Sequence, residues 1–151
     1  MSSKDKSFKN IVVIDSNFIL LPFQFKIDFL HEINLSLEGM TAFIIFQQVF
    51  NELEAKSKRE KNATKFQRHF NSGKLYIEKN KEKYDLIFKE DVKNIEEITD
   101  DFLLRKAVDL KKDSNKVFIA TNDQDLKRKA RKANVGVIFL RQKKYLSIER
   151  S

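Results

Sequence analysis

The chain has 151 residues, the usual size of one compact domain, and its 30 Lys and Arg outnumber 22 Asp and Glu to give a net charge of +8. It contains no cysteine, which excludes disulfides, zinc–thiolate sites and thiol nucleophiles and suits a reducing compartment. Because no apolar run approaches the ~20 residues that span a bilayer, and the N-terminus is polar, we expect a cytoplasmic protein with neither signal peptide nor membrane contact.

Continuous apolar runs rich in β-branched and aromatic residues predict strands that are buried on both faces. In chain order they cover 11–14, 42–46, a weaker run at 85–88, 117–120 and 137–140. Segments with helical spacing separate them, at 23–33, 47–58, 102–110 and 126–133. The alternation predicts an α/β fold whose mostly parallel sheet of four to five strands is flanked by helices.

The remaining segments predict the domain organisation. We expect one domain over 1–151, with 1–9 as a flexible N-terminal tail. The stretch 55–83 is dense in Lys, Arg and Asn, and its apolar residues are sparse, so we interpret it as surface helix and loop. His31 and His69 are expected on the surface. Phe23 and Phe25 could serve a contact with a dimer mate or another partner, but burial in the core is the favoured interpretation.

Acidic residues follow two of the predicted strands. Asp15 comes directly after the first strand, and Asp123 lies just beyond the fourth. Each has an ordinary alternative role, since Asp15 or Asn17 can cap the next helix, and Asn122 can cap a helix whose first turn contains Asp123. In open α/β sheets, however, ligands bind at the carboxyl ends of the strands. Two acids at one edge of the sheet therefore favour a site.

Two further acids lie on predicted helices. Asp100 and Asp101 begin the helix near 102–110, where acids complement the helix dipole, and Asp101 is favoured for a site because it adjoins the buried run. Glu52 flanks the apolar stripe of 47–58, although it can equally be a surface residue paired with Lys56.

Convergence of the four acids would require a cation or protonation. Two carboxylates ~4 Å apart repel by roughly 4 kcal/mol at an effective dielectric constant of 20. Oxygen ligands without a Cys or His cluster indicate Mg²⁺ or Mn²⁺ rather than zinc.

At these residues the sequence resembles the PIN-domain nucleases. The resemblance covers nearly the whole chain and lies in 12–17 (VVIDSN), 49–53 (VFNEL), 100–104 (DDFLL) and 120–123 (ATND). Two further stretches, 20–26 (LLPFQFK) and 140–146 (LRQKKYL), resemble archaeal PIN proteins related to the eukaryotic nuclease that processes pre-18S ribosomal RNA. Ser16 stands where the family usually has Thr, and Gln47 where it often has Pro, but no acidic position is lost.

The resemblance implies a three-layer PIN-like fold, and it implies roles for eight polar residues of the expected site. It implies that four residues are catalytic and hold one or two Mg²⁺ or Mn²⁺ ions: Asp15, Glu52, Asp101 and Asp123. Four others would orient these carboxylates or the attacking water, the first two being the stronger candidates: Asn17, Thr121, Asp100 and Asp125.

The resemblance further implies metal-assisted endonucleolytic hydrolysis of RNA in small-subunit ribosomal RNA maturation. The partners would be a ribosomal RNA precursor, ribosome-assembly factors and a second copy of the chain. The basic charge agrees with a nucleic-acid partner, although a Lys-rich composition alone also explains it. Phosphate contacts are predicted from Lys127, Arg128, Arg131, Lys132, Arg141, Lys143 and Lys144, and a second basic wall from Lys56, Lys58, Arg59, Lys65 and Arg68.

Three other functions remain open at this point. One is a toxin ribonuclease restrained by an antitoxin, against which the 140–146 tail argues. Another is a non-catalytic RNA-binding module of ribosome assembly, against which the intact acidic set argues. The third is a phosphoryl-transfer domain with Asp15 as phosphoacceptor, which is disfavoured because Asn17 stands where a second Asp is usual.

Overall fold

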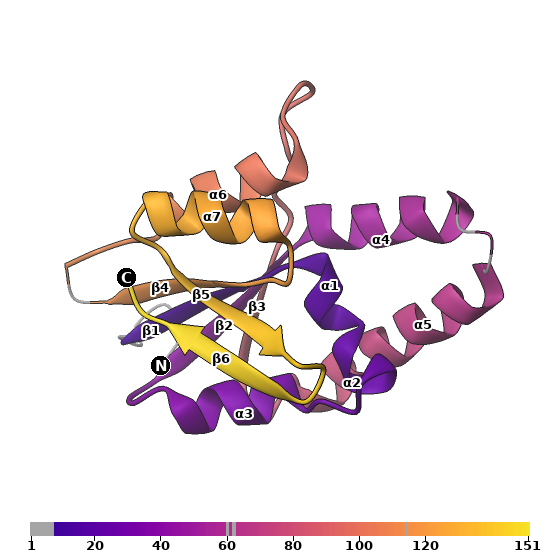
Figure 1. The fold of residues 1–151 in the computed structure, drawn as a ribbon, viewed down its shortest axis with the longest axis horizontal. Coiled ribbons are helices and arrows are strands. Elements are labelled where there is room, and N and C mark those ends of the chain that lie inside the picture. The colour runs from indigo at the N-terminus through magenta and orange to yellow at the C-terminus, as the bar shows by residue number, and fades with distance from the viewer. Residues whose placement is uncertain (1–7, 60, 62, 114) are drawn as a thin grey trace.

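The structure, a computed structural model, describes residues 8–59, 61, 63–113 and 115–151 (Figure 1). Residues 1–7 of the predicted flexible tail therefore lie outside the described residues. Within the described part, a sheet of six strands has the order β3-β2-β1-β4-β5-β6, parallel except where β6 joins β5. The strands are β1 (Asn10–Ile14), β2 (Thr41–Phe46), β3 (Asp85–Lys89), β4 (Lys116–Ala120), β5 (Gly136–Arg141) and β6 (Tyr145–Glu149).

All five apolar runs form strands, which confirms the predicted α/β class. The number of strands was underestimated, because we predicted four to five and did not foresee β6. This edge strand is only half buried and contains Ser147 and Glu149, so it has no continuous apolar run. It returns antiparallel to β5 through a tight turn in which Gln142 and Lys143 adopt positive φ angles of 51° and 57°.

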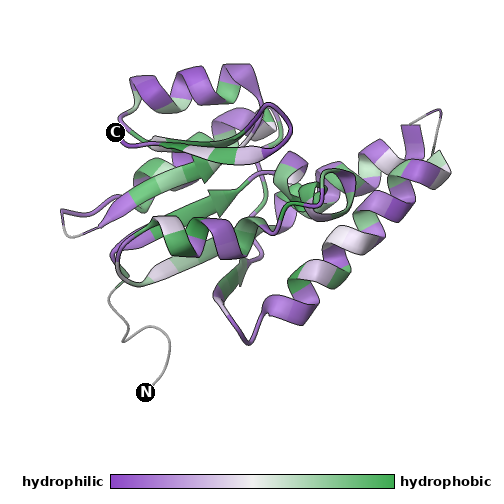
Figure 2. Ribbon diagram, turned by 60° about the horizontal axis from the view of Figure 1, so that its bottom comes forward, coloured by the Kyte–Doolittle hydropathy of each residue, from purple (hydrophilic) through white to green (hydrophobic). Residues whose placement is uncertain are grey.

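Helices cover both faces of the sheet and complete the three predicted layers. In Figure 1, α3 (Phe29–Ser36) lies below the sheet, and α6 (Thr99–Asp109) and α7 (Gln124–Lys132) lie above it. The sheet is the most hydrophobic part of the molecule, whereas the outer helix surfaces are polar (Figure 2). None of the helices in the described ranges is long and apolar enough to cross a membrane.

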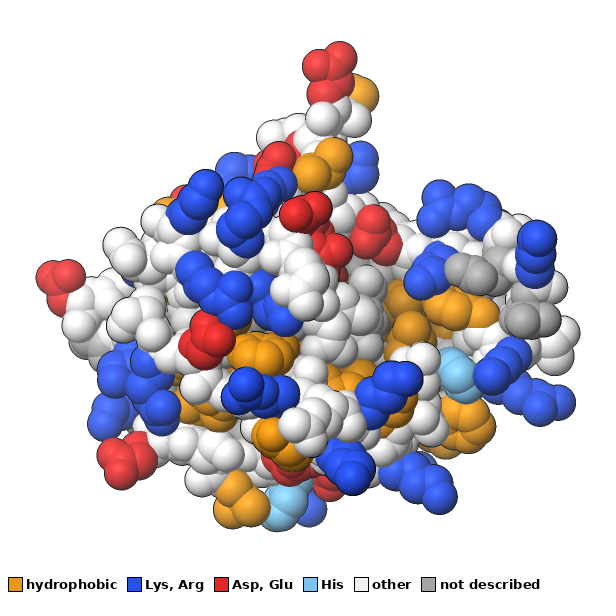
Figure 3. Space-filling view, in the orientation of Figure 1, with side chains coloured by type: hydrophobic (Ala, Val, Ile, Leu, Met, Phe, Trp, Pro, Cys, Tyr) orange, Lys and Arg blue, Asp and Glu red, His pale blue; other side chains and the backbone are white. Residues whose placement is uncertain are grey.

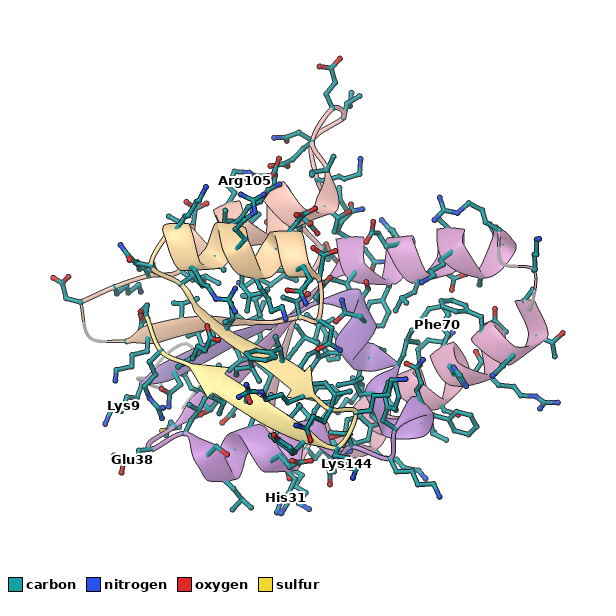
Figure 4. All side chains as sticks on the ribbon, viewed as in Figure 1. Lys9, His31, Glu38, Phe70, Arg105 and Lys144 are labelled. Carbon is teal, nitrogen blue, oxygen red and sulfur yellow. The ribbon has the colours of Figure 1, made fainter. Side chains whose placement is uncertain are left out.

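Four helices form an arm at the carboxyl ends of the central strands (Figure 1). This helical arm consists of α1 (Ser16–Ile19), α2 (Leu21–Gln24), α4 (Gln47–Arg59) and α5 (Ala63–Asn80). The helix predicted at 23–33 is in fact divided between α2 and α3, because Lys26 between them has a φ of 57°, which no helix accommodates. The basic stretch at 55–83 contains a long helix, α5, whose buried Phe70 lies between α4 and α5 (Figure 4).

Close backbone packing holds α5 against α1. A Cβ atom on Gly73 of α5 would collide with the backbone carbonyl oxygen of Ile19, which has no rotamer with which to move away. Glycine therefore allows the two helices to approach at this point despite its cost within a helix.

We predict that Gly73→Ala lowers the free energy of unfolding by about 1–3 kcal/mol, because overpacking against the Ile19 carbonyl outweighs the gain in helix propensity. Urea denaturation measures this difference. Ser72→Ala on the same helix is the matched control and is expected to be neutral or slightly stabilising. Equal stability of Gly73→Ala and wild type would contradict the packing of α5 against α1.

Candidate active site

The carboxyl group of Asp15 is buried at the end of β1, with 4% of the residue exposed. It accepts hydrogen bonds from the backbone N–H of Ser16 at 2.7 Å and the hydroxyl of Thr121 at 2.6 Å. Burial is the largest influence on this group and raises the pKa of Asp15, and the charges of Glu52 and Asp123 raise it further. Asp15 also caps α1, as the alternative interpretation anticipated.

A hydrogen-bond network fixes the carboxyl group of Asp15 across three strand ends. Thr121 follows β4 and is fully buried, and the amide Nδ2 of Asn17 donates to Asp15 Oδ2 at 3.2 Å and to the Thr121 hydroxyl at 3.3 Å. Asn122 joins β5 to the network. Its backbone N–H donates to Asn17 Oδ1 at 3.1 Å, and its Oδ1 accepts from the Leu140 N–H at 2.8 Å. Thr121 and Asn17 thus occupy the positions that we expected for supporting residues.

The role of Asn122 was not foreseen. Its place between a strand and an acid resembles a helix N-cap, but Asp123 is the cap of α7 and accepts from the Leu126 N–H at 2.8 Å. Capping does not remove Asp123 from the site, because its charge raises the pKa of both Asp15 and Asp100. Asp123 therefore caps α7 and also lies close enough to the strand ends for its charge to act on both carboxyl groups.

We expected Asp101 to face the site, but in the structure Asp100 faces the strand ends instead. Asp101 points to solvent and pairs with Lys129 at 2.8 Å. Asp100 is half buried, and burial together with the charges of Asp123 and Asp15 raises the pKa of Asp100 to about 6. Successive residues of a helix point ~100° apart, so only one of two adjacent acids can face the strand ends. The structure gives that position to Asp100.

Glu52 approaches the same region from the arm. It is exposed on α4, and its charge contributes to the raised pKa of Asp15. With Asn17, Lys56 and Arg59, Glu52 lines a cavity of about 200 Å³ between α1 and α4. In Figure 3, acidic side chains gather in the area between α7 and α4, with basic side chains on either side.

The carboxylate oxygens at this edge of the sheet suit a hard divalent cation, although the side chains do not form a closed coordination site. Among the described residues, no three His, Cys, Asp or Glu side chains converge closely enough to form a ready metal site. Burial, and after it the charges of the neighbouring acids, nevertheless raises the pKa of Asp15 and Asp100, and a divalent cation would offset both effects. Carboxylate oxygens are the ligands that Mg²⁺ and Mn²⁺ prefer. The residues therefore fit such an ion once their side chains close upon it.

Three of the α7 residues predicted around the site, namely Asp125, Arg128 and Arg131, take part in ion pairs. Asp125 is exposed in the first turn, 3.8 Å from Arg128, and lies apart from the network around Asp15. Arg131 donates to Glu149 of β6 at 2.8 Å. These pairs neutralise part of the charge that we assigned to phosphate binding.

Lys127 does not fit the predicted phosphate contacts. Its side chain is buried, with Nζ 4.3 Å from the ring centroid of Phe139, and burial lowers its pKa. We expected this helix to bury Leu126, Ala130 and Ala133, but its inner face also includes Lys127, which the basic pattern of the sequence had assigned to the exposed side. The other predicted contacts are exposed and include Lys132, Arg141, Lys143 and Lys144, the last of which is labelled in Figure 4.

Comparisons with known proteins agree with this architecture. The sequence pattern of the family described as "PIN like domain" matches residues 12–143, a range that contains every acid of the candidate site. Ribonuclease VapC4 of Methanocaldococcus jannaschii is 29% identical over 139 residues, which cover 91% of this chain and 95% of the relative. The solved structure of the PIN domain endonuclease Utp24 is similar with a TM-score of 0.67, at 22% identity and over 93% of this chain and 92% of that one.

We predict that Asp100→Asn stabilises the metal-free protein by about 1 kcal/mol at pH 8, a value reduced for solvent screening of a half-buried group. In the folded protein the pKa of Asp100 is raised from 3.8 to about 6, so its ionised form disfavours folding above pH 6. The penalty is lost as the pH falls from 6 towards 4, and the variant should then gain nothing. Urea denaturation in EDTA at pH 8 and pH 4.5 measures this, with Asp101→Asn as the control that gains at neither pH.

Proposed function

Since this chain belongs to the PIN-like domain family, we propose that it is a metal-dependent endoribonuclease that hydrolyses RNA phosphodiester bonds. The observation that carries the proposal is the buried carboxyl group of Asp15, held by Thr121 and Asn17 and surrounded by the charges of further acids. Burying a carboxylate among other carboxylates costs free energy, and a cation-dependent reaction gives this arrangement a use. Ribonuclease VapC4, which aligns over nearly the whole chain, supports RNA as the substrate.

Four carboxylates would hold the cation, namely Asp15, Glu52, Asp100 and Asp123. The bound Mg²⁺ or Mn²⁺ would supply Lewis-acid polarisation of the phosphodiester and activation of the attacking water. The sequence-based assignment had Asp101 in place of Asp100, and we now propose Asp100 because it faces the strand ends while Asp101 is paired with Lys129.

The neighbouring side chains would orient these carboxylates and the RNA. Thr121 and Asn17 both donate hydrogen bonds to Oδ2 of Asp15. These bonds hold that oxygen in place and so fix the orientation of the carboxyl group. Lys56 and Arg59 lie beside Glu52 in the same cavity and are placed to bind the phosphates that flank the scissile bond. The chain needs no covalent nucleophile in this scheme.

We further propose a precursor of small-subunit ribosomal RNA as the substrate. The support is the resemblance of segments 20–26 and 140–146 to PIN proteins of that branch. Segment 20–26 includes α2 of the arm, in which Leu21 is buried and Phe23 and Gln24 are exposed. Segment 140–146 contains the turn between β5 and β6, whose residues 142–144 are exposed. Surface segments of this kind suit recognition of a particular RNA or assembly partner.

Cleavage by adjacent aspartate variants tests the site. Asp100→Asn should lower the rate of RNA cleavage on the order of 100-fold or more, because it removes a proposed cation ligand. Asp101→Asn, which only breaks the surface pair with Lys129, should retain most of the activity. The assay follows a labelled single-stranded RNA on denaturing gels with Mn²⁺, and EDTA should abolish cleavage.

The outcome separates the proposed enzyme from a binding module. Equal loss in both aspartate variants would contradict the assignment of Asp100, and full activity of Asp15→Asn would contradict the whole site. Absence of cleavage by wild type with Mg²⁺ or Mn²⁺, together with RNA binding, would instead support a non-catalytic module.

Mapping of the products tests the proposed substrate. A single cut in precursor ribosomal RNA, with unrelated transcripts left intact, is expected of a processing enzyme. Cleavage of many transcripts and growth arrest on expression of the wild type, but not of Asp15→Asn, would point to a toxin ribonuclease instead.

A further inference from the structure

A second hollow lies on the helical arm, outside the acidic cluster. It has a volume of about 630 Å³ between α2 and the first half of α5. Its described lining combines aromatic and basic side chains and contains no acid, the residues being Phe23, Lys61, Ala63, Thr64, Lys65, Arg68 and His69. We call this hollow the arm pocket.

Phe23 is unusually placed for a large apolar side chain. Half of the residue is exposed, at 50%, although the sequence led us to expect it in the core. Its ring lies 5.0 Å from that of His69, centroid to centroid and tilted by 51°, so the two form a surface platform rather than part of the core. Exposed aromatic rings of this kind offer a face on which a nucleobase can stack.

The surroundings of this platform are positively charged. Lys65 and Arg68 extend from α5 at the rim of the arm pocket, and neither takes part in an ion pair found among the described residues. The first turn of α5, which contains no acid, also lines the pocket. In Figure 3, basic side chains surround a hydrophobic patch and a histidine at the arm end of the molecule.

Basic residues also connect the arm pocket to the acidic cluster. The cavity beside Glu52 contains Lys56 and Arg59 at the end of α4, and α5 follows directly after α4 in the chain. A further hollow of about 380 Å³ is lined by Ser57 of α4 and Arg68 of α5, and it shares Ala63, Thr64 and Arg68 with the arm pocket. A strand held at the acids can therefore follow a cationic path along the arm.

We propose that the arm pocket is a subsite for single-stranded RNA, in which an unpaired base stacks on Phe23 and His69 while Lys65 and Arg68 bind the adjoining phosphates. The inference rests on the proposed ribonuclease function and adds to it a site on the arm that holds an unpaired base of the substrate. A duplex cannot use the platform, because its bases are already stacked on one another.

Charge decides between RNA and a protein partner as the occupant. A protein-binding hollow of this size would be expected to have an apolar floor with a mixed polar rim. Here the described lining has several cationic side chains and no acid, so its charge complements a polyanion. Its aromatic part is limited to two rings, an area that matches one base.

Binding of a fluorescein-labelled 12-nucleotide single-stranded RNA by the full chain in EDTA tests the proposal, with gels to verify that the RNA stays intact. Phe23→Ala should weaken binding by roughly 5- to 100-fold, the range for loss of one stacked base. Phe23→Trp should restore it. The matched control is Phe88→Ala, since Phe88 on β3 is equally exposed, at 49%, and lines none of the hollows described above. The same RNA in a duplex should bind less tightly than the single strand and lose little on Phe23→Ala.

The phosphate contacts have a separate readout. Lys65→Gln and Arg68→Gln should each reduce the slope of log affinity against log salt concentration by about 0.7, the value for one single-strand phosphate contact. Phe23→Ala should leave that slope unchanged.

Several outcomes would overturn the subsite. Wild-type affinity in Phe23→Ala, or an equal loss in Phe88→Ala, would do so. Unchanged RNA affinity with a shift from dimer to monomer in light scattering would identify the platform as a contact between copies of the chain instead. If wild type does not cleave RNA yet Phe23→Ala weakens binding, the cleavage proposal fails and the RNA subsite stands. If wild type cleaves and the Phe23 variants bind normally, only the subsite fails.

Discussion

The carboxyl group of Asp15 lies where β1 ends beside β4, and the Thr121 hydroxyl donates to it at 2.6 Å. An acid buried at this depth is tolerated only if its oxygens have partners, and the partners here come from residues that follow two strands. This requirement fixes the register of β1 against β4, the conformation of the turn after β4 and the start of α7. Among the other acids, Asp123 caps α7, and its charge contributes to the raised pKa of Asp100.

The sheet carries the acids of the proposed catalytic site, and the helical arm carries the proposed RNA-binding surface. The central strands are buried on both faces and give the acid network a rigid support, which a site needs for defined geometry. The arm begins with α1, directly after Asp15, and packs through Gly73 against the backbone of Ile19. The proposed catalytic site at the strand ends and the proposed RNA-binding surface of the arm are therefore joined by a short, closely packed connection.

The sequence was most informative where burial imposes a strong pattern. The apolar strands and the acids directly at their ends were predicted, because a strand buried on both faces admits few polar residues. Several exposed or half-exposed features were not predicted. The polar strand β6 has no apolar run, and the choice between Asp100 and Asp101 depends on where α6 begins, since one residue rotates a side chain by ~100°. The exposure of Phe23 depends on where α5 lies, and that is set by contacts between distant residues.

The order of the strands also has a consequence for biosynthesis. Asp15 and Thr121, which hydrogen-bond to each other, are separated by 106 positions, and Asp123 lies further along still. A nascent chain that has emerged through β1, β2 and the arm already displays Asp15 and Glu52, but it lacks the hydroxyl and the acids that complete the cluster. Pairing of β1 with β4 requires closure of this long loop. The acidic centre that we propose acts on RNA is thus assembled only after β4 and the residues that follow it have been synthesised.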